Sequence, residues 1–185
     1  NVYTTGFFSN TATFGTTTLV STGSNDIFVA KQDAEGNFLW AKQMGGTSID
    51  RGYSLAVDGS GNIYTTGYYQ GTATFGTTTL TSSGNDFADM FVAKQDAAGN
   101  FLWAKQMGVT SADRGYSLAV DDAGNIYTTG FFEGTATFGT TTLTSSGDRD
   151  IFVAKQDTNG NVLWVEKMGG ILGDAGYDIE VDSEG

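Results

Sequence analysis

Residues 62–67 read Asn-Ile-Tyr-Thr-Thr-Gly, and nearly the same hexapeptide begins at Asn1 and at Asn125. The same series of segments follows each copy, so the 185 residues divide into repeats at 1–61, 62–124 and 125–185. A fixed period of this kind is typical of repeat architectures, in which each unit buries its apolar surface against its neighbours. The whole chain is therefore predicted to be one array of three similar units.

The second repeat contains four main segments with strand character, at residues 63–69, 90–95, 101–107 and 116–120. β-branched and aromatic residues dominate these segments, and the sequence contains no proline and no stretch with a helical period. Residues 73–80 add a threonine-rich hairpin that turns at Gly76. Turns of the form Asp-x-x-Gly-Asn, as at Asp96, join the longer segments and predict hairpin connections.

Four antiparallel strands per repeat predict a β-propeller blade rather than a β-solenoid coil, because solenoid coils are usually much shorter. Blades pack face to face, so both sides of each strand must be apolar or small. Residues 116–120 obey this rule, because Tyr116, Leu118 and Val120 alternate with Ser117 and Ala119. The predicted fold class is all-β, a propeller array of three near-identical four-stranded antiparallel blades.

Three long segments carry a resemblance to a known family. They read GYSLAVDGSGNIYTTG at residues 52–67, GYSLAVDDAGNIYTTG at residues 115–130 and DIFVAKQDAEGNFLWAKQMGG at residues 26–46. They resemble the bacterial β-propeller repeat (SBBP) proteins, and the repeats cover the whole chain. The resemblance implies a secreted or surface-exposed module of a bacterium, often part of a long surface protein, with a molecular activity that is mostly unassigned.

The order of strands in such a blade predicts how the chain closes. Residues 116–120 are expected to form the innermost strand, so each numbered repeat begins at the second strand of a blade. Three blades are too few to close a ring. Closure is expected from head-to-tail oligomerisation, with two chains forming a six-bladed ring, or from flanking repeats of a longer chain. The residues predicted to meet at this closure are Tyr177, Ile179, Val181, Val2 and Tyr3.

Composition excludes several classes of site. Twenty-one acids against nine bases give a net charge of -12, which argues against nucleic acid as a partner. The absence of cysteine and histidine excludes disulfides, thiolate chemistry and most transition-metal sites. No run of about 18 apolar residues is present to span a membrane. The turn aspartates are interpreted as caps of their own turns rather than calcium ligands, so no metal or cofactor is predicted.

Aromatic residues supply the candidate ligand-binding sites. Three adjacent pairs are expected to be exposed and could bind glycans, and they are Phe7 with Phe8, Tyr68 with Tyr69, and Phe131 with Phe132. Three tryptophans could also stack on sugars, but their place among apolar strand residues favours core packing. The tryptophans are Trp40, Trp103 and Trp164.

An acid stands before each innermost strand, at Asp50, Asp113 and Asp174. In the first two repeats an arginine follows it, at Arg51 and Arg114. These residues are predicted to tie neighbouring blades together by hydrogen bonds, with a catalytic acid paired to arginine as the alternative. The third repeat keeps the acid and loses the arginine, which favours a role centred on the carboxylate.

The close identity of the repeats favours a noncatalytic scaffold for adhesion or assembly. Residues 62–83 and 125–146 differ only at positions 68–70 of the earlier copy, whereas an enzyme site usually needs different residues from different blades. A lectin with repeated pockets between blades is the alternative. A lyase or hydrolase is the third hypothesis, because Asp178 and Glu180 replace serine and alanine in the last innermost strand and would face the axis.

Overall fold

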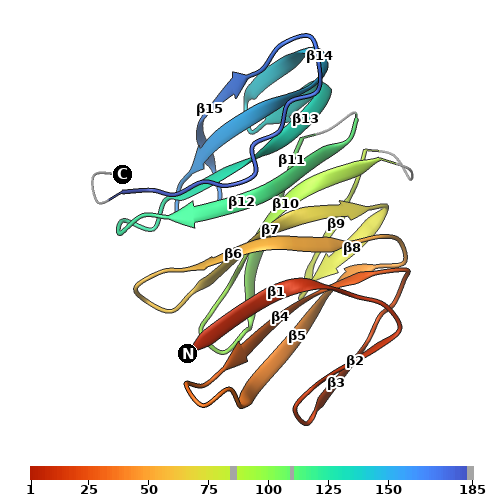
Figure 1. Cartoon of the computed structure of the whole chain (residues 1–185), viewed down its shortest axis with the longest axis vertical. Helices are drawn as coiled ribbons and strands as arrows, with labels where there is room; N and C mark the ends of the chain where they lie inside the picture. Colours follow the sequence, from red (N-terminus) through yellow and green to blue (C-terminus); the bar gives the residue numbers. More distant parts are fainter. Residues whose placement is uncertain (84–86, 109–110, 183–185) are drawn as a thin grey trace.

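The protein is seen in a computed structural model that describes residues 1–83, 87–108 and 111–182. The elements within these ranges are all β-strands, as predicted. None of the described residues belongs to a helix that could cross a membrane. The strands form three main sheets that follow one another from the N-terminus to the C-terminus and do not close into a ring (Figure 1).

The second and third sheets are complete four-stranded antiparallel blades. The second contains, in spatial order, β6 (Arg51–Val57), β7 (Ile63–Gln70), β10 (Ala88–Gln95) and β11 (Phe101–Met107). The third contains β12 (Asp113–Val120), β13 (Ile126–Phe138), β14 (Thr141–Gln156) and β15 (Val162–Met168). The strand order predicted from the repeats is confirmed in both. We call these sheets blade 2 and blade 3.

The first sheet, blade 1, contains β1 (Val2–Phe8), β4 (Asp26–Gln32) and β5 (Phe38–Gly46). β1 pairs with β4 along its whole length, as β7 pairs with β10. Among the described residues, no strand takes the place next to β1 that β6 takes next to β7. One edge of β1 is therefore open.

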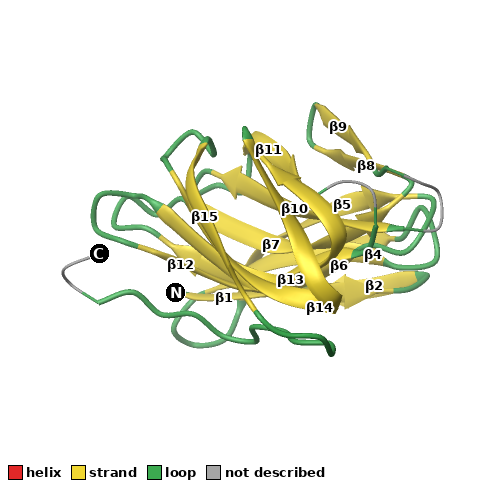
Figure 2. Cartoon of the chain, turned by 90° about the horizontal axis from the view of Figure 1, so that it is seen from above, coloured by secondary structure: helices red, strands yellow, loops and turns green. Residues whose placement is uncertain are grey.

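A threonine-rich hairpin projects from each blade. In blade 1 it is formed by β2 (Thr11–Phe14) and β3 (Thr17–Val20), in blade 2 by β8 (Thr72–Phe75) and β9 (Thr78–Thr81), and in blade 3 by extensions of β13 and β14. The β8–β9 hairpin crosses to the preceding blade, where Gly45 and Gly46 of β5 pair with β8 (Figure 2). In the same way, the Gly108 amide donates to the carbonyl of Thr137. The hairpins therefore fasten each blade to the one before it.

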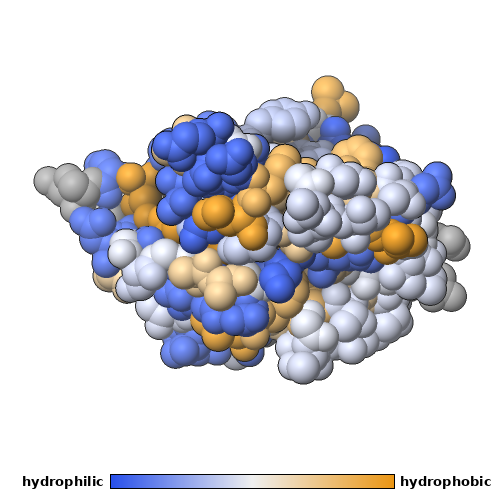
Figure 3. Space-filling model, turned by 90° about the horizontal axis from the view of Figure 1, so that it is seen from below, coloured by the Kyte–Doolittle hydropathy of each residue, from blue (hydrophilic) through white to orange (hydrophobic). Residues whose placement is uncertain are grey.

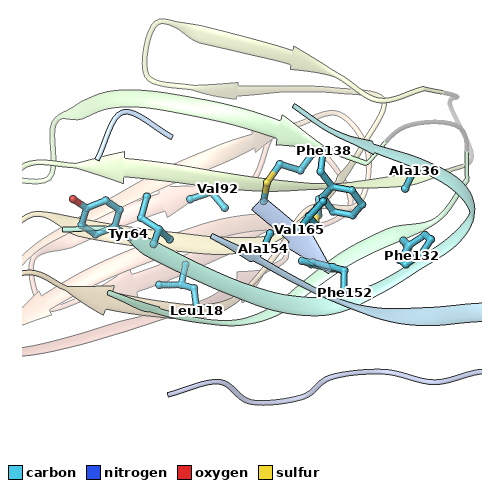
Figure 4. Close-up of a cluster of buried hydrophobic side chains, with 12 residues drawn as sticks. Tyr64, Val92, Leu118, Phe132, Ala136, Phe138, Phe152, Ala154 and Val165 are labelled. Carbon is cyan, nitrogen blue, oxygen red and sulfur yellow. The ribbon is translucent and has the colours of Figure 1, made fainter. Parts of the chain in front are cut away.

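The hydrophobic core consists of two layers, one between each pair of neighbouring blades. Ile63 packs in the layer between blades 1 and 2, and the next residue, Tyr64, packs in the layer between blades 2 and 3. Figure 4 shows the second layer, where Tyr64 and Val92 of blade 2 face Leu118 and Ala154 of blade 3. Strands of the middle blade are thus buried on both faces, which is the pattern that the sequence predicted.

Residues 177–181 do not form the predicted innermost strand. The segment lies beside β12, with the ring of Tyr177 stacked on Tyr116 at 5.2 Å and the Asp178 carboxylate accepting a hydrogen bond from Ser117. A strand needs a backbone neighbour to pair with. Among the described residues this segment has no counterpart of β7 beside it, so it remains extended chain.

Candidate functional site

The aromatic pairs predicted as exposed ligand sites are mostly buried. Tyr69 and Phe132 have no exposed surface, Tyr68 and Phe131 are 4% and 2% exposed, and Phe8 is also buried. Only Phe7, on the open side of blade 1, is 43% exposed. The prediction of exposure was wrong because Tyr69 and Phe132 pack in the two core layers. The rings of Tyr68 and Phe131 are covered by arginine side chains.

Arginine side chains cover three of these rings. The guanidinium of Arg51 lies 4.4 Å from the ring of Phe7 in the preceding blade, and that of Arg114 lies 4.5 Å from Tyr68. The third repeat has Ala175 at the corresponding position, and there Arg149 of β14 stacks on Phe131 at 4.6 Å. A cation over an aromatic face is attractive. The first two contacts join neighbouring blades, whereas Arg149 and Phe131 belong to adjacent strands of blade 3. Comparison of the repeats alone could not find Arg149.

The acids before the innermost strands lie at the corners between blades. The Asp50 carboxylate accepts hydrogen bonds from the amide of Gly46 at 2.6 Å and from the amide of Gln70 at 3.2 Å. These donors belong to the end of β5 in blade 1 and the end of β7 in blade 2, so one side chain joins two blades. Asp174 accepts a similar bond from Gly170 at 2.9 Å. Asp113, at the boundary of blades 2 and 3, is fully buried.

A second buried acid stands at each corner, and sequence reasoning missed it. These acids lie at equivalent positions of the three repeats, at Asp26 of β4, Asp89 of β10 and Asp150 of β14. Asp26 accepts a hydrogen bond from Gln43 at 2.6 Å, and Asp150 accepts one from Lys167 at 3.0 Å. Gly45 lies between Asp26 and Asp50. A methyl group built on it would lie 2.8 Å from an Asp50 oxygen and 3.2 Å from Cγ of Asp26, so a larger residue would crowd both carboxyl groups. The available signal was the aspartate that recurs three residues before Val29, Val92 and Val153, at the same position in every repeat.

Burial next to a second acid changes the ionisation of these carboxyl groups. Desolvation, with a smaller contribution from the charge of Asp26, raises the pKa of Asp50 to about 6. Desolvation and the charge of Asp89 raise the pKa of Asp113 to about 8. Two acids of unlike pKa can act as acid and base, but Asp26, Asp50, Asp89 and Asp113 have no exposed surface and cannot touch a substrate.

Two of the three tryptophans, Trp40 and Trp103, pack between blades. A methyl group built on Gly160, in a turn of blade 3, would lie 2.9 Å from the ring of Trp103 in blade 2. Gly99 meets Trp40 in the same way at 3.2 Å. Trp164 of the last blade is 41% exposed. Each blade therefore offers a tryptophan as a platform for a turn of the next blade.

Replacing Trp103 by alanine is expected to destabilise the fold by about 3 kcal/mol, because it empties the space beneath the turn at Gly160. The matched change Trp164→Ala is expected to cost less than half as much at protein concentrations where the chain is a single copy. Urea midpoints of the two variants provide the measurement. Equal losses of unfolding free energy in the two variants would contradict the idea that the turn of the following blade makes Trp103 important.

The turn aspartates cap their own turns, which confirms the structural interpretation. Asp96 accepts hydrogen bonds from the amides of Ala98 and Asn100 and from the side-chain amide of Asn100. The bonds from Asn100 hold the pKa of Asp96 below its ordinary value. Among the described residues, no group of three or more acidic side chains is arranged to hold a metal ion.

The two acids predicted to face the axis lie on the exposed last segment. The carboxylate of Asp178 accepts hydrogen bonds from Ser117 at 2.8 Å and from the amide of Ile179 at 3.0 Å. Glu180 lines an open hollow of about 550 Å³ together with Tyr127, Val181 and Asp182. Asp178 is thus engaged with blade 3, and Glu180 is exposed beside the hollow.

Comparison with known proteins agrees with this geometry. The SBBP β-propeller repeat matches residues 39–68 and 102–130, and each match runs from the outermost strand of one blade through the two innermost strands of the next. Over these two segments the chain is similar to SBBP repeats. The predicted resemblance is therefore confirmed at two boundaries, where Asp50 and Asp113 lie within the matched segments.

Two relatives align with most of this chain. An uncharacterized WD repeat-containing protein of Acanthamoeba polyphaga mimivirus is 28% identical over 189 residues, covering 91% of this chain and 14% of that protein. Regulatory protein FlaEY of Caulobacter vibrioides is 29% identical over 166 residues, covering 86% of this chain and 17% of that protein. The chain spans less than one fifth of either relative's length. Propeller-type repeats and a WD-repeat relative point to a scaffold-type domain.

Proposed function

We propose that the array is a noncatalytic interaction scaffold, which presents its loops and hairpins to protein partners in adhesion or assembly. The observation that supports this proposal is that the chemically distinctive side chains are engaged at the boundaries between blades. At the boundary of blades 1 and 2, the carboxylates of Asp26 and Asp50 accept hydrogen bonds from side-chain or backbone amides. At both boundaries, tryptophans and arginines pack on turns or aromatic rings of the neighbouring blade. The chemically distinctive residues thus hold blades together and leave the exposed loops for binding.

A glycan-binding propeller is the second candidate, because two related hollows recur between blades. One of about 300 Å³ is lined by residues that include Gln43, Gly76 and Phe101. The other, of about 320 Å³, is lined by residues that include Gln106, Gly139 and Val162. Repeated pockets suit a lectin with several equivalent sites. Burial of the aromatic pairs weakens this candidate, because sugars need an exposed ring to stack on.

Binding assays on the immobilised 185-residue chain separate the two candidates. The scaffold is expected to show saturable binding to at least one purified protein of a panel and no binding on a glycan array. Glycan binding that is lost in the double variant Gln43→Ala and Gln106→Ala would overturn the scaffold proposal in favour of the lectin. Gln32→Ala, which changes a glutamine outside both hollows, is the matched control.

Catalysis by Asp178 and Glu180 is tested by replacing them with the serine and alanine that the other two repeats have at these positions. The double variant Asp178→Ser and Glu180→Ala is expected to have the same activity as the parent chain on a panel of glycosides and esters, namely none above buffer. Turnover by the parent chain that this variant loses would contradict a noncatalytic function.

We also propose that the scaffold lies outside the cell or on the surface of a bacterium, as the family resemblance implies. Brief protease treatment of intact cells that produce the protein is expected to degrade it while cytoplasmic marker proteins survive. Survival of the protein until the cells are lysed would contradict this placement.

A further inference from the structure

The two outer faces of the array, on blade 1 and on blade 3, have no neighbouring blade. Equivalent residues of the repeats show how much apolar surface this exposes. On the blade 1 face, Val2 is 54% exposed, whereas its counterparts Ile63 and Ile126 have no exposed surface. On the blade 3 face, Met168 is 50% exposed, whereas its counterpart Met107 is 2% exposed. Figure 3 shows the molecule from below, where hydrophobic side chains interrupt the polar surface. Both faces thus carry apolar residues that a neighbouring blade covers elsewhere in the chain.

We propose that the blade 3 face binds the blade 1 face of a second copy of this chain, and that two chains close a six-bladed ring. Residues 177–181 of each chain would then serve as the innermost strand beside β1 of the other. Six blades lie within the usual range of about four to eight for propellers. This inference goes beyond the proposed scaffold role and does not depend on it.

The register of this strand addition follows from blades 2 and 3. Gly52 pairs with Gly67, and Gly115 pairs with Gly130. Residues 176–181 read Gly-Tyr-Asp-Ile-Glu-Val, with glycine, tyrosine and the last two apolar residues placed as in residues 115–120. The same register places Gly176 opposite Gly6 of the second copy and Val181 opposite Val2. The open edge of β1 thus meets a segment with the sequence of its missing neighbour.

The hollow beside Tyr127 is where the second copy would enter. Tyr64, the counterpart of Tyr127 in blade 2, packs in one layer with Leu118 and Ile126 of blade 3. At the proposed interface the corresponding residues are Ile179 of the same chain and Val2 of the second copy. Tyr127, Glu180 and Val181 line the open hollow of about 550 Å³ at this position. Val2 of the second copy would fill part of it with an apolar side chain.

Contacts at the outer rim repeat in the same way. Lys31 donates to the carbonyl of Ala97 in the next blade, and Lys94 donates to that of Thr158. Lys155, which lies over Tyr127 at 4.8 Å, is placed to donate to the carbonyl of Ala34 of the second copy. The turn at residues 33–37 of that copy would cover Trp164, as the turn at Gly160 covers Trp103.

The β2–β3 hairpin of blade 1 would also contact the other chain in the proposed ring. A methyl group built on Gly46 would meet the backbone of Thr72 in the β8–β9 hairpin, whereas one built on Gly170 meets nothing within 4 Å. Gly170 is the counterpart of Gly46 at the end of the last blade. The β2–β3 hairpin of the second copy would occupy this space. Each chain carries both halves of the interface, so two copies can use it twice and close the ring.

The mass of the 185-residue chain in solution is the first test. Sedimentation equilibrium is expected to give twice the chain mass of 19.5 kDa over a wide range of protein concentration. A single-chain mass at every concentration would overturn the proposal and leave the faces for flanking blades. A series of ever larger species would overturn the closed ring.

Gly6→Ala tests strand addition. Built methyl groups on Gly67 and Gly130 meet the backbone carbonyls of Arg51 and Arg114 in the adjoining innermost strands. On Gly6 the nearest atom is instead the end of the Phe28 ring, at 2.9 Å, which can move aside. The variant is therefore expected to keep its circular dichroism spectrum and to fall to a single-chain mass.

The matched control is Gly59→Ala, because a methyl group built there meets nothing within 4 Å. It is expected to keep the two-chain mass. A two-chain mass for Gly6→Ala as well would overturn the addition of a strand to β1, and loss of the two-chain mass in both variants would do the same.

A cysteine pair tests the register, since the chain has no cysteine of its own. Ser54 pairs with Thr66 and Ser117 with Thr129, so Asp178 would face Thr5 of the second copy. A chain with Thr5→Cys and Asp178→Cys is expected to oxidise to a covalent pair of chains in high yield. The shifted control with Thr4→Cys and Asp178→Cys is expected to cross-link at least about tenfold more slowly. Equal rates would overturn the register.

Discussion

Lowering the pH from 8 to 5 is expected to stabilise the fold by on the order of 3–5 kcal/mol. The cause is the buried acids between blades, because the pKa of Asp50 is raised to about 6 and that of Asp113 to about 8. Such a change is a large part of the stability of a small domain. Urea midpoints at pH 5, 6.5 and 8 would measure it.

The sign follows from proton binding. A carboxyl group whose pKa is higher in the folded chain binds more protons when folded, so its contribution favours folding at low pH. That contribution is complete below the ordinary aspartate pKa of about 4. It is lost as the pH rises through about 6 for Asp50 and about 8 for Asp113. Stability should therefore fall between pH 5 and 8.

Asp113→Asn isolates the larger part of this effect, since it removes the ionisable group with the higher pKa. The variant is expected to lose about half or more of the change in stability between pH 5 and 8. Asp122→Asn, at an exposed turn position, is the matched control and should keep the full change. The Gly6→Ala background keeps association from contributing to the midpoints. A parent chain that becomes more stable toward pH 8 would contradict the role of the buried acids.

The aspartates of the turns limit the stability of the fold at low pH. Hydrogen bonds from Asn37 lower the pKa of Asp33, and bonds from Asn100 lower that of Asp96. Carboxylates with a lowered pKa stabilise the fold above their unfolded value, and the stabilisation is lost as the pH falls through the folded value. Stability is therefore expected to be highest near pH 5. Below that pH the turn aspartates become protonated, and above it the buried acids between blades become ionised.

The sequence predicted the strands and their order because each repeat contains the whole local pattern of a blade. Turns such as Asp96 to Asn100 join neighbours in the sheet, so order along the chain becomes order in space. The alternation of side chains along a strand could not show which of them are exposed. Tyr68 lies beneath Arg114 of blade 3, while Tyr69 packs in the core layer toward blade 1. A strand covered on both faces has no polar side to mark the solvent.

The contacts between blades were harder to predict than the blades. Asp26 and Asp50 belong to different blades and meet only because Gly45 allows both to approach. Arg149 takes the place of an arginine that stands before the innermost strand in the other repeats, although it comes from β14. The first contact depends on how two sheets lie against each other, which a comparison of repeats does not contain. The second depends on an arginine of β14 that has no counterpart in the other repeats.

Gly67→Ala is expected to destabilise the fold by about 3 kcal/mol or more. Gly67 lies on β7 opposite Gly52, where the pairing with β6 shifts its register. A methyl group there meets the backbone carbonyl of Arg51, and a backbone atom in a paired strand cannot rotate away as a side chain can. Relief requires β6 to separate from β7, which breaks ladder hydrogen bonds and opens the core layers on both sides.

The same change in the first repeat is the strongest comparison. Gly6 occupies the same position on β1, but no innermost strand lies beside β1 within the described chain. At protein concentrations where the chain is a single copy, Gly6→Ala should therefore lose less than about 1 kcal/mol, close to the control Gly59→Ala, while Gly67→Ala and Gly130→Ala lose several times more. Urea midpoints of the four variants at one concentration would show this order. Equal losses at Gly6 and Gly67 would mean that the glycine is required by its own strand rather than by the neighbour, and the clash predicted for a second copy would lose its basis.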